Sequence, residues 1–219
     1  TLTTQLMNFE YMKYNVVAAQ MSRGKAEKST GFAIASVAGT LSRMAMDVCL
    51  YLNQNFNFIS FPDEMTTGSS IMPHKKNPDV FELIRSKCNK IQAVPNQLIL
   101  MTNNLPSGYH RDYQLLKEVI IPAIQELKAC LDMALYTLKD IRVNDNITDA
   151  KMYDYLFSVD TLNELVNNGM PFRDAYKKMG VEIQNGTFTP LRNIKHTHEG
   201  SIGNLCLEEI KKKMENAFA

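Results

Sequence analysis

Hydrophobic positions recur at helical spacing through three long stretches of the chain. The first stretch covers residues 25–54 and contains no proline. Its apolar side chains fall on nearly every side, which predicts a long helix that is buried on most sides. The second stretch covers residues 77–104, and the third covers residues 112–138. The apolar positions of the first stretch include Phe32, Ile34, Val37, Leu41, Met44, Val48 and Leu52.

Helix-start signals and prolines refine the second and third stretches. Asn77, Pro78 and Asp79 supply an N-cap residue, a proline for the first helical position and an acid for the first turn. Pro95 and Pro122 predict kinks, because proline lacks an N–H and crowds the preceding turn. Three helices of this length predict an all-α antiparallel bundle. The third helix should bury Leu116, Val119, Ile120, Ile124, Leu127, Leu131 and Leu135.

The predicted elements become shorter after residue 141. Helices are expected at residues 149–156, 158–168 and 171–185, with a last one from residue 201. Gly169 and Gly186 are well placed to end two of them. We therefore expect a long-helix bundle over residues 1–141 and a small helical domain over residues 142–219.

Composition argues against several kinds of binding partner and structural site. The 24 Lys and Arg residues balance 23 Asp and Glu residues, so net charge indicates neither nucleic acid nor an anionic membrane surface. The four widely spaced cysteines match neither a disulfide framework nor a thiolate zinc site, which favours the reducing cytoplasm. No long uncharged apolar run or signal pattern predicts a membrane segment. The first residue is Thr1 rather than methionine, which suggests part of a longer protein.

The strongest chemical signal lies in the predicted loop at residues 62–78. It contains Gly68, Ser69 and Ser70, followed by Pro73, Lys75 and Asn77. Small residues let backbone N–H groups converge on an anion, and elimination beside a carboxylate needs a base together with preorganised positive partners. The loop resembles the G-S-S-x-x-P-x-K-x-N signature of the fumarase/aspartase superfamily at every fixed position.

This resemblance implies a role for each polar residue of the loop. Ser69 would abstract the proton, and Lys75 would stabilise the dianionic intermediate. Ser70 and Asn77 would bind substrate, although Asn77 could equally cap the following helix. Gly68 and the acidic Glu82 would orient the loop, although an exposed helix-face charge is the commoner role for a glutamate.

A second segment, at residues 105–118, resembles the pattern L-P-x-x-Y-x-x-D-x-Q-x-x-K-E of the argininosuccinate lyase family. Tyr109, Gln114 and Lys117 match it and would contact the amino-acid end and the carboxylates of the substrate. On a helix that begins near Asp112, Gln114 and Lys117 would project to one side. The alternative interpretation is an ordinary polar first turn.

Matches at residues 41–47 and 169–175 extend the resemblance over most of the chain. It implies the second half of a central helical bundle, a homotetramer, and β-elimination of argininosuccinate to arginine and fumarate without metal or organic cofactors. The family's Thr-His segment, which carries the general acid, has no counterpart here. We therefore expect a C-terminal portion that is inactive alone.

Other interpretations remain open. Adenylosuccinate lyase, fumarase and aspartase share the loop, but the pattern at residues 109–117 argues against them. A non-catalytic homologue similar to δ-crystallin is the alternative from outside the enzymes. His74 replaces the glutamine of most relatives. His196 and His198 have a metal-binding spacing, but no third ligand is apparent, so a solvated loop is expected.

Overall fold

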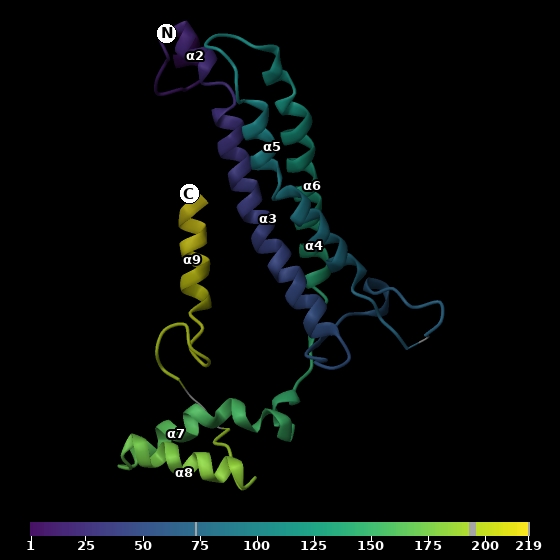
Figure 1. The fold of residues 1–219 in the computed structure, drawn as a ribbon, viewed down its shortest axis with the longest axis vertical. Helices are drawn as coiled ribbons and strands as arrows, with labels where there is room; N and C mark the ends of the chain where they lie inside the picture. Colours follow the sequence, from purple (N-terminus) through teal and green to yellow (C-terminus); the bar gives the residue numbers. More distant parts are fainter. Residues whose placement is uncertain (73, 193–195, 219) are drawn as a thin grey trace. The chain divides into compact units, whose positions relative to one another are not determined.

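The computed structural model describes residues 1–72, 74–192 and 196–218. The chain is mostly helical and divides into two units, Thr1–Asn144 and Asp145–Ala219 (Figure 1). Each unit has buried apolar clusters of its own. The all-α expectation is therefore confirmed. The assignment of residues 1–141 and 142–219 to two domains remains a prediction. The contact boundary follows Asn144 because Arg142 and Val143 pair with an earlier strand of the first unit.

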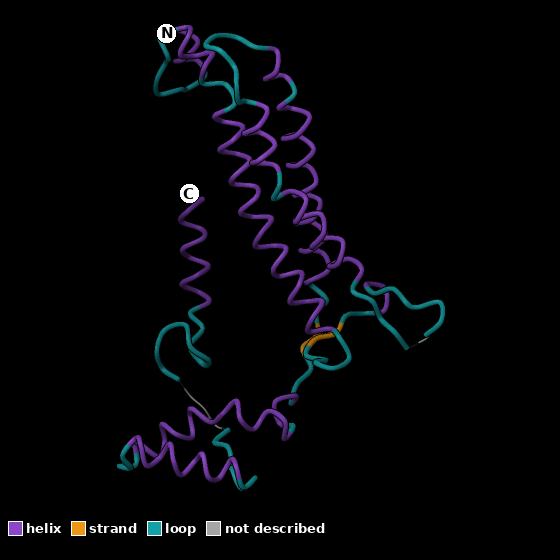
Figure 2. The backbone as a smooth tube through the Cα atoms, viewed as in Figure 1, coloured by secondary structure: helices purple, strands orange, loops and turns teal. Residues whose placement is uncertain are grey.

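The first unit is built on one long helix and the shorter helices packed against it. A two-residue antiparallel ladder pairs Ile59 with Val143 and Ser60 with Arg142, and it is the orange segment of Figure 2. The elements are α1 (Leu2–Leu6), α2 (Val16–Met21), α3 (Lys25–Leu52), β1 (Ile59–Ser60), η1 (Asp63–Met65), α4 (Asp79–Ile91), α5 (Val94–Met101), η2 (Arg111–Gln114), α6 (Leu116–Leu138) and β2 (Arg142–Val143).

Helix α3 begins at the predicted residue and packs against α4, α5 and α6. Ala38 and Ala45 are fully buried, and their small side chains allow neighbouring backbones to approach closely. The expectation of burial on most sides is wrong for this chain, because Phe32 is 56% exposed and Met46 is 46% exposed. The side of α3 that carries Phe32 and Met46 is therefore apolar but uncovered.

The predicted helix over residues 77–104 is two helices. Helix α4 ends at Ile91, and α5 begins at Val94 with Pro95 in its first turn. A proline ring clashes with the carbonyl group four residues earlier, which here belongs to Ile91. Pro95 therefore ends one helix and fits the first turn of the next, rather than kinking a continuous helix.

Helix α6 begins at Leu116, after the short 3₁₀ helix η2. Leu116, Ile120 and Leu127 are buried as predicted. Leu131 and Leu135 are 41% and 64% exposed, so that part of the predicted buried stripe is wrong within this chain. Ala134 and Thr137 occupy the buried side instead, since α6 packs on α4 through that face.

The second unit contains only short helices among its described residues: η3 (Ile147–Asp149), η4 (Lys151–Phe157), α7 (Ser158–Asn167), α8 (Phe172–Gln184) and α9 (Leu207–Phe218). Gly169 and Gly186 have φ values of 94° and 67° and follow the ends of α7 and α8, as predicted. The expected helix at residues 149–156 is 3₁₀ rather than α. The last helix begins at Leu207, later than predicted.

The segment Val16–Leu52 is long and apolar enough to cross a membrane by length and composition. Buried helices of soluble proteins share this property. Within the first unit, Leu41, Ala45 and Val48 of this segment form part of a packed core. One side of this segment is therefore packed in a core, although only 28% of its apolar window is buried.

Candidate active site

Two buried aromatic rings hold the base of the signature loop. Phe61 precedes the loop and Phe81 follows it, and their ring centroids lie 5.5 Å apart. Both side chains belong to the core formed by α3, α4 and α6. The two ends of the loop at residues 62–78 are therefore held next to each other in the core of the first unit.

A pair of backbone hydrogen bonds closes the neck of the loop. The N–H of Thr67 donates to the carbonyl oxygen of Asn77 at 3.2 Å, and the N–H of Asn77 donates back at 2.8 Å. The Asn77 side chain also donates to the Thr67 carbonyl, at 3.3 Å. Helix α4 begins at Asp79 and Pro78 occupies the N-cap position, so the prediction of Asn77 as the helix cap is wrong.

Side chains strengthen the neck on two sides. Lys76 donates to the carboxylate of Asp63 from η1, and the Thr67 hydroxyl donates to the carboxylate of Asp79. The hydrogen bond from Lys76 holds the pKa of Asp63 below its ordinary value. No sequence pattern predicts these two side-chain contacts, because their partners are 12 or more positions apart and the backbone bridge brings them together.

The hydroxyl oxygen of Ser69 accepts two backbone hydrogen bonds within the loop. The N–H of Ile71 donates at 3.2 Å and the N–H of Met72 donates at 3.1 Å. Backbone N–H groups converge as expected, but those involved follow Ser69 rather than lying at Gly68 and Ser70. Two donors aimed at one oxygen favour a negative charge on that oxygen.

The other predicted loop residues are accessible. Ser70 and Lys75 are exposed, Ser69 is half-buried, and a side chain added at Gly68 would meet open space. Glu82 is exposed on the first part of α4. Within the described part of the chain, Lys75 and Glu82 form no ion pair, so the role of Glu82 in orienting the loop remains a prediction. Pro73 of the signature lies outside the described residues.

The second group of predicted residues lies on η2, on the loop before it and at the start of α6. The side-chain amide of Gln114 donates to the Tyr109 hydroxyl at 3.1 Å. Lys117 is exposed in the first turn of α6, whereas Gln114 belongs to η2, so the prediction of one shared α-helix is wrong. Gln114 is the last residue of the 3₁₀ turn at residues 111–114, and Lys117 follows in a separate helix.

Arg23 is a neighbour of this group that sequence patterns did not indicate. Its guanidinium carbon lies 5.8 Å from the ring centroid of Tyr109 and 5.5 Å from that of Tyr113. Tyr113 is buried against α5 and α6. The cation therefore stabilises both rings from the junction of α2 and α3.

The structure does not bring the two groups together in one chain. The group around Tyr109 lies against Arg23, just before α3 begins, whereas the loop follows β1, beyond the end of α3 (Figure 1). Helix α3 has 28 residues, so it is about 42 Å long. Ser69 and Tyr109 therefore belong to opposite ends of the first unit.

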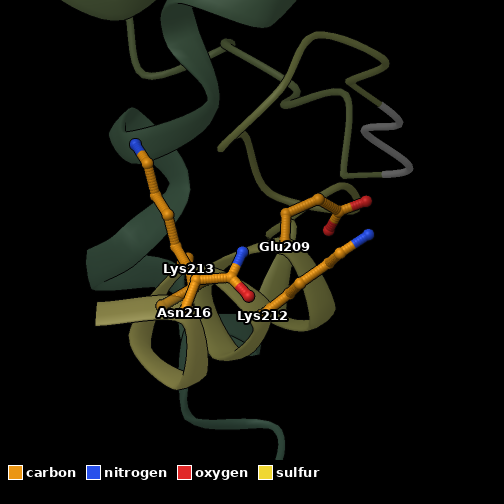
Figure 3. Close-up of a pocket in the computed structure, with 5 residues that line it drawn as sticks. Glu209, Lys212, Lys213 and Asn216 are labelled. Atoms are coloured by element: carbon orange, nitrogen blue, oxygen red, sulfur yellow. The ribbon is translucent and has the colours of Figure 1, made fainter. Parts of the chain in front are cut away.

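Three further features of the described residues belong to neither of these two groups. A surface hollow on α9 is lined by Glu209, Ile210, Lys212, Lys213 and Asn216 (Figure 3), which all belong to that one helix. The Nε2 atom of His196 lies 3.1 Å from the Asp160 carboxylate of α7, so this histidine pairs with a neighbouring helix of the second unit. Among the described residues, no group of three His, Cys, Asp or Glu side chains is arranged to hold a metal ion.

Comparison with solved structures supports the helical architecture. The chain superposes on EDDS lyase with a TM-score of 0.70 and 20% sequence identity, over 84% of this chain and 37% of that structure. It superposes on a fumarate lyase:delta crystallin protein from Brucella melitensis with a TM-score of 0.66 and 20% identity, over 84% and 41% of the two chains. Residues 3–93 match the protein family described as Lyase. The fold and the signature loop are similar to those of the fumarase/aspartase superfamily of lyases.

Relatives with higher identity narrow this class. The chain is 58% identical over 213 residues to argininosuccinate lyase of Phocaeicola vulgatus, covering 97% of this chain and 48% of that protein. It is 56% identical over 218 residues to argininosuccinate lyase of Bacteroides fragilis, covering all of this chain and 49% of that protein. Over nearly all of its length the chain is therefore similar to argininosuccinate lyases. It spans about half the length of the curated relatives that it matches.

Proposed function

We propose that the chain supplies the proton-abstracting loop of an argininosuccinate lyase, which releases fumarate and arginine in the cytoplasm. The observation that carries this proposal is the pair of backbone N–H groups that donate to Ser69 Oγ. A serine hydroxyl is a weak base, and its ionised form is stabilised by donors that already point at the oxygen.

The reaction follows from this arrangement. Ser69 takes the proton from the substrate carbon that lies beside a carboxylate, and the electron pair spreads into that carboxylate to give a dianion. The Lys75 ammonium stabilises the added charge, with Ser70 and Asn77 as donors to the substrate. The carbon–nitrogen bond then breaks as the double bond of fumarate forms, and an acid protonates the leaving nitrogen of arginine.

We also propose that a complete site needs more than one copy of the subunit. Ser69 and Tyr109 lie beyond opposite ends of an α3 helix about 42 Å long, too far apart for both to contact one substrate. Uncovered apolar residues on α3 and α6 support a homo-oligomer, which the family resemblance makes a tetramer. These 219 residues alone are then expected to be inactive.

The test is fumarate formation from argininosuccinate by the full-length protein, followed at 240 nm. Ser69→Ala should lower kcat at least about a hundredfold, the usual scale for a positioned base, while the thermal unfolding midpoint stays unchanged. Ser107→Ala is a matched control outside the loop. A Ser69→Ala enzyme with more than half of the wild-type kcat would remove Ser69 from the mechanism.

A further inference from the structure

Two adjacent lysines in the signature loop have different surroundings. Lys76 donates to the carboxylate of Asp63, from the turn of η1 that begins the loop. The Lys75 ammonium group has no hydrogen bond or ion pair within the part of the chain that the structure describes. Two neighbouring ammonium groups could both attract a substrate carboxylate, yet only one of them is free to do so.

The backbone on both sides of the two lysines is held in place. The bridge between Thr67 and Asn77 fixes the chain directly after Lys76, and the N–H of Lys75 donates to the carbonyl oxygen of Met72 at 3.0 Å. Among these contacts, Lys76 is held through its side chain by Asp63, whereas Lys75 is held through its backbone.

We propose that Asp63 and Lys76 are positioning residues, which act by withdrawing the second lysine so that Lys75 alone meets the substrate carboxylate. This proposal rests on the proposed lyase function and deepens it. Neither residue touches the substrate. Their ion pair selects which of two like charges is presented beside Ser69.

If the ion pair only stabilised the fold, its loss would change the unfolding midpoint together with turnover. Both partners are exposed, Lys76 by 54% and Asp63 by 81%, and exposed ion pairs contribute little to folding stability. The loop is already anchored by its backbone bridge and by Phe61 and Phe81. Loss of the ion pair should therefore change turnover without changing unfolding. A substrate carboxylate held by the wrong ammonium is displaced from the base, and small displacements are costly to the rate.

The experiment measures kcat, KM and the thermal unfolding midpoint of the full-length enzyme and its variants. Asp63→Asn, which frees the Lys76 ammonium, should lower kcat/KM about tenfold. Lys76→Asp should lower it by a similar factor for a different reason, because it leaves two carboxylates that compete with the substrate for Lys75. The double variant with Asp63→Lys and Lys76→Asp, which restores the pair in reverse, should recover to within about threefold of wild type. Lys76→Arg should keep most of the activity. Glu182→Gln, which removes another exposed ion pair, is the matched control.

The outcomes separate this proposal from the function on which it rests. A wild-type enzyme that releases no fumarate from argininosuccinate overturns the proposed function. An active wild type whose single variants stay within about twofold overturns the pairing role alone. The same conclusion follows if the reversed pair is no more active than the weaker single variant, or if the single variants lose activity only in proportion to lost folding.

Discussion

The rings of Phe61 and Phe81 lie 5.5 Å apart between centroids, tilted by 32°, at the two ends of the signature loop, and both are buried in the core of α3, α4 and α6. The side chains that are predicted to do chemistry are exposed or half-buried. The exposed loop proposed to be catalytic is thus fixed at both ends to the packed core of the first unit. The loop position depends on packing that lies outside the loop itself.

Replacing Phe81 by alanine should therefore be costly. The ring is 1% exposed, and removal of a buried phenylalanine typically costs about 3–5 kcal/mol of unfolding free energy. Urea denaturation of the full-length protein, followed by circular dichroism, measures the loss. Phe56→Ala is the matched control because its ring is 39% exposed. Equal losses in the two variants would show that Phe81 does not anchor the loop.

The hydroxyl of Tyr109 can be removed without removing its ring. Tyr109→Phe abolishes the hydrogen bond from Gln114 but leaves the surface on which Arg23 stacks. A neutral hydrogen bond is worth about 0.5–1.5 kcal/mol, so we expect KM for argininosuccinate to rise up to about tenfold. Steady-state kinetics measure the change, with Tyr113→Phe as the control. An unchanged KM would remove the Tyr109 hydroxyl from substrate binding.

Two buried thiols predict a loss of stability in alkali. Burial raises the pKa of Cys88 to about 12 and also raises the pKa of Cys130, which packs beside it. Above the ordinary thiol pKa of about 8.5, unfolded cysteines release protons that the native thiols retain. Their stabilising contribution is complete below that pH and is lost as the pH rises toward 12. Urea midpoints at pH 7 and pH 10 test this.

Cys88→Ala should flatten the dependence of the urea midpoint on pH, whatever its effect at pH 7. Cys206→Ala is the control, since that thiol is only partly buried and lies in the other unit. An equally steep fall of the midpoint with pH in the Cys88→Ala variant would assign the alkaline loss to other groups.

The exposed side of α6 predicts where subunits associate. Ile121, Leu131 and Leu135 are 48%, 41% and 64% exposed. With Lys117, Ile124 and Lys128 they recur at alternating spacings of four and three residues, the pattern of helix–helix seams. Leu135→Glu should lower the mass in solution, measured by light scattering. Met133→Glu, on another side of α6, should leave the mass unchanged, and an unchanged mass in both variants would exclude this seam.

The sequence was sufficient for the helices whose limits have local causes. The start of α3 follows a glycine, and the ends of α7 and α8 precede Gly169 and Gly186 in positive-φ conformations. Sequence patterns did not predict the helix break at Pro95, which comes from a steric conflict between residues four positions apart. Pro95 was expected to bend a helix, but its ring excludes the carbonyl of Ile91 and breaks the helix instead.

Sequence patterns located the candidate loop but not its supports. Ser69 and Lys75 are recognisable because the loop chemistry depends on a short motif. Asp63 and Arg23 have no such signal, since their partners are brought near by a backbone bridge and by a helix junction. The face of α6 was misassigned because a helix with two apolar sides gives no sequence indication of which side its own chain covers.

The length of α3 has a consequence for how such proteins diversify. Substitutions around Tyr109 and substitutions around Ser69 are separated by about 42 Å of helix and share no contacts, so their effects on folding should add. Selection can therefore change the end that is proposed to bind the amino-acid part of the substrate while the end that is proposed to abstract the proton stays fixed. Under the proposed function, substrate specificity can then change while the elimination reaction stays the same.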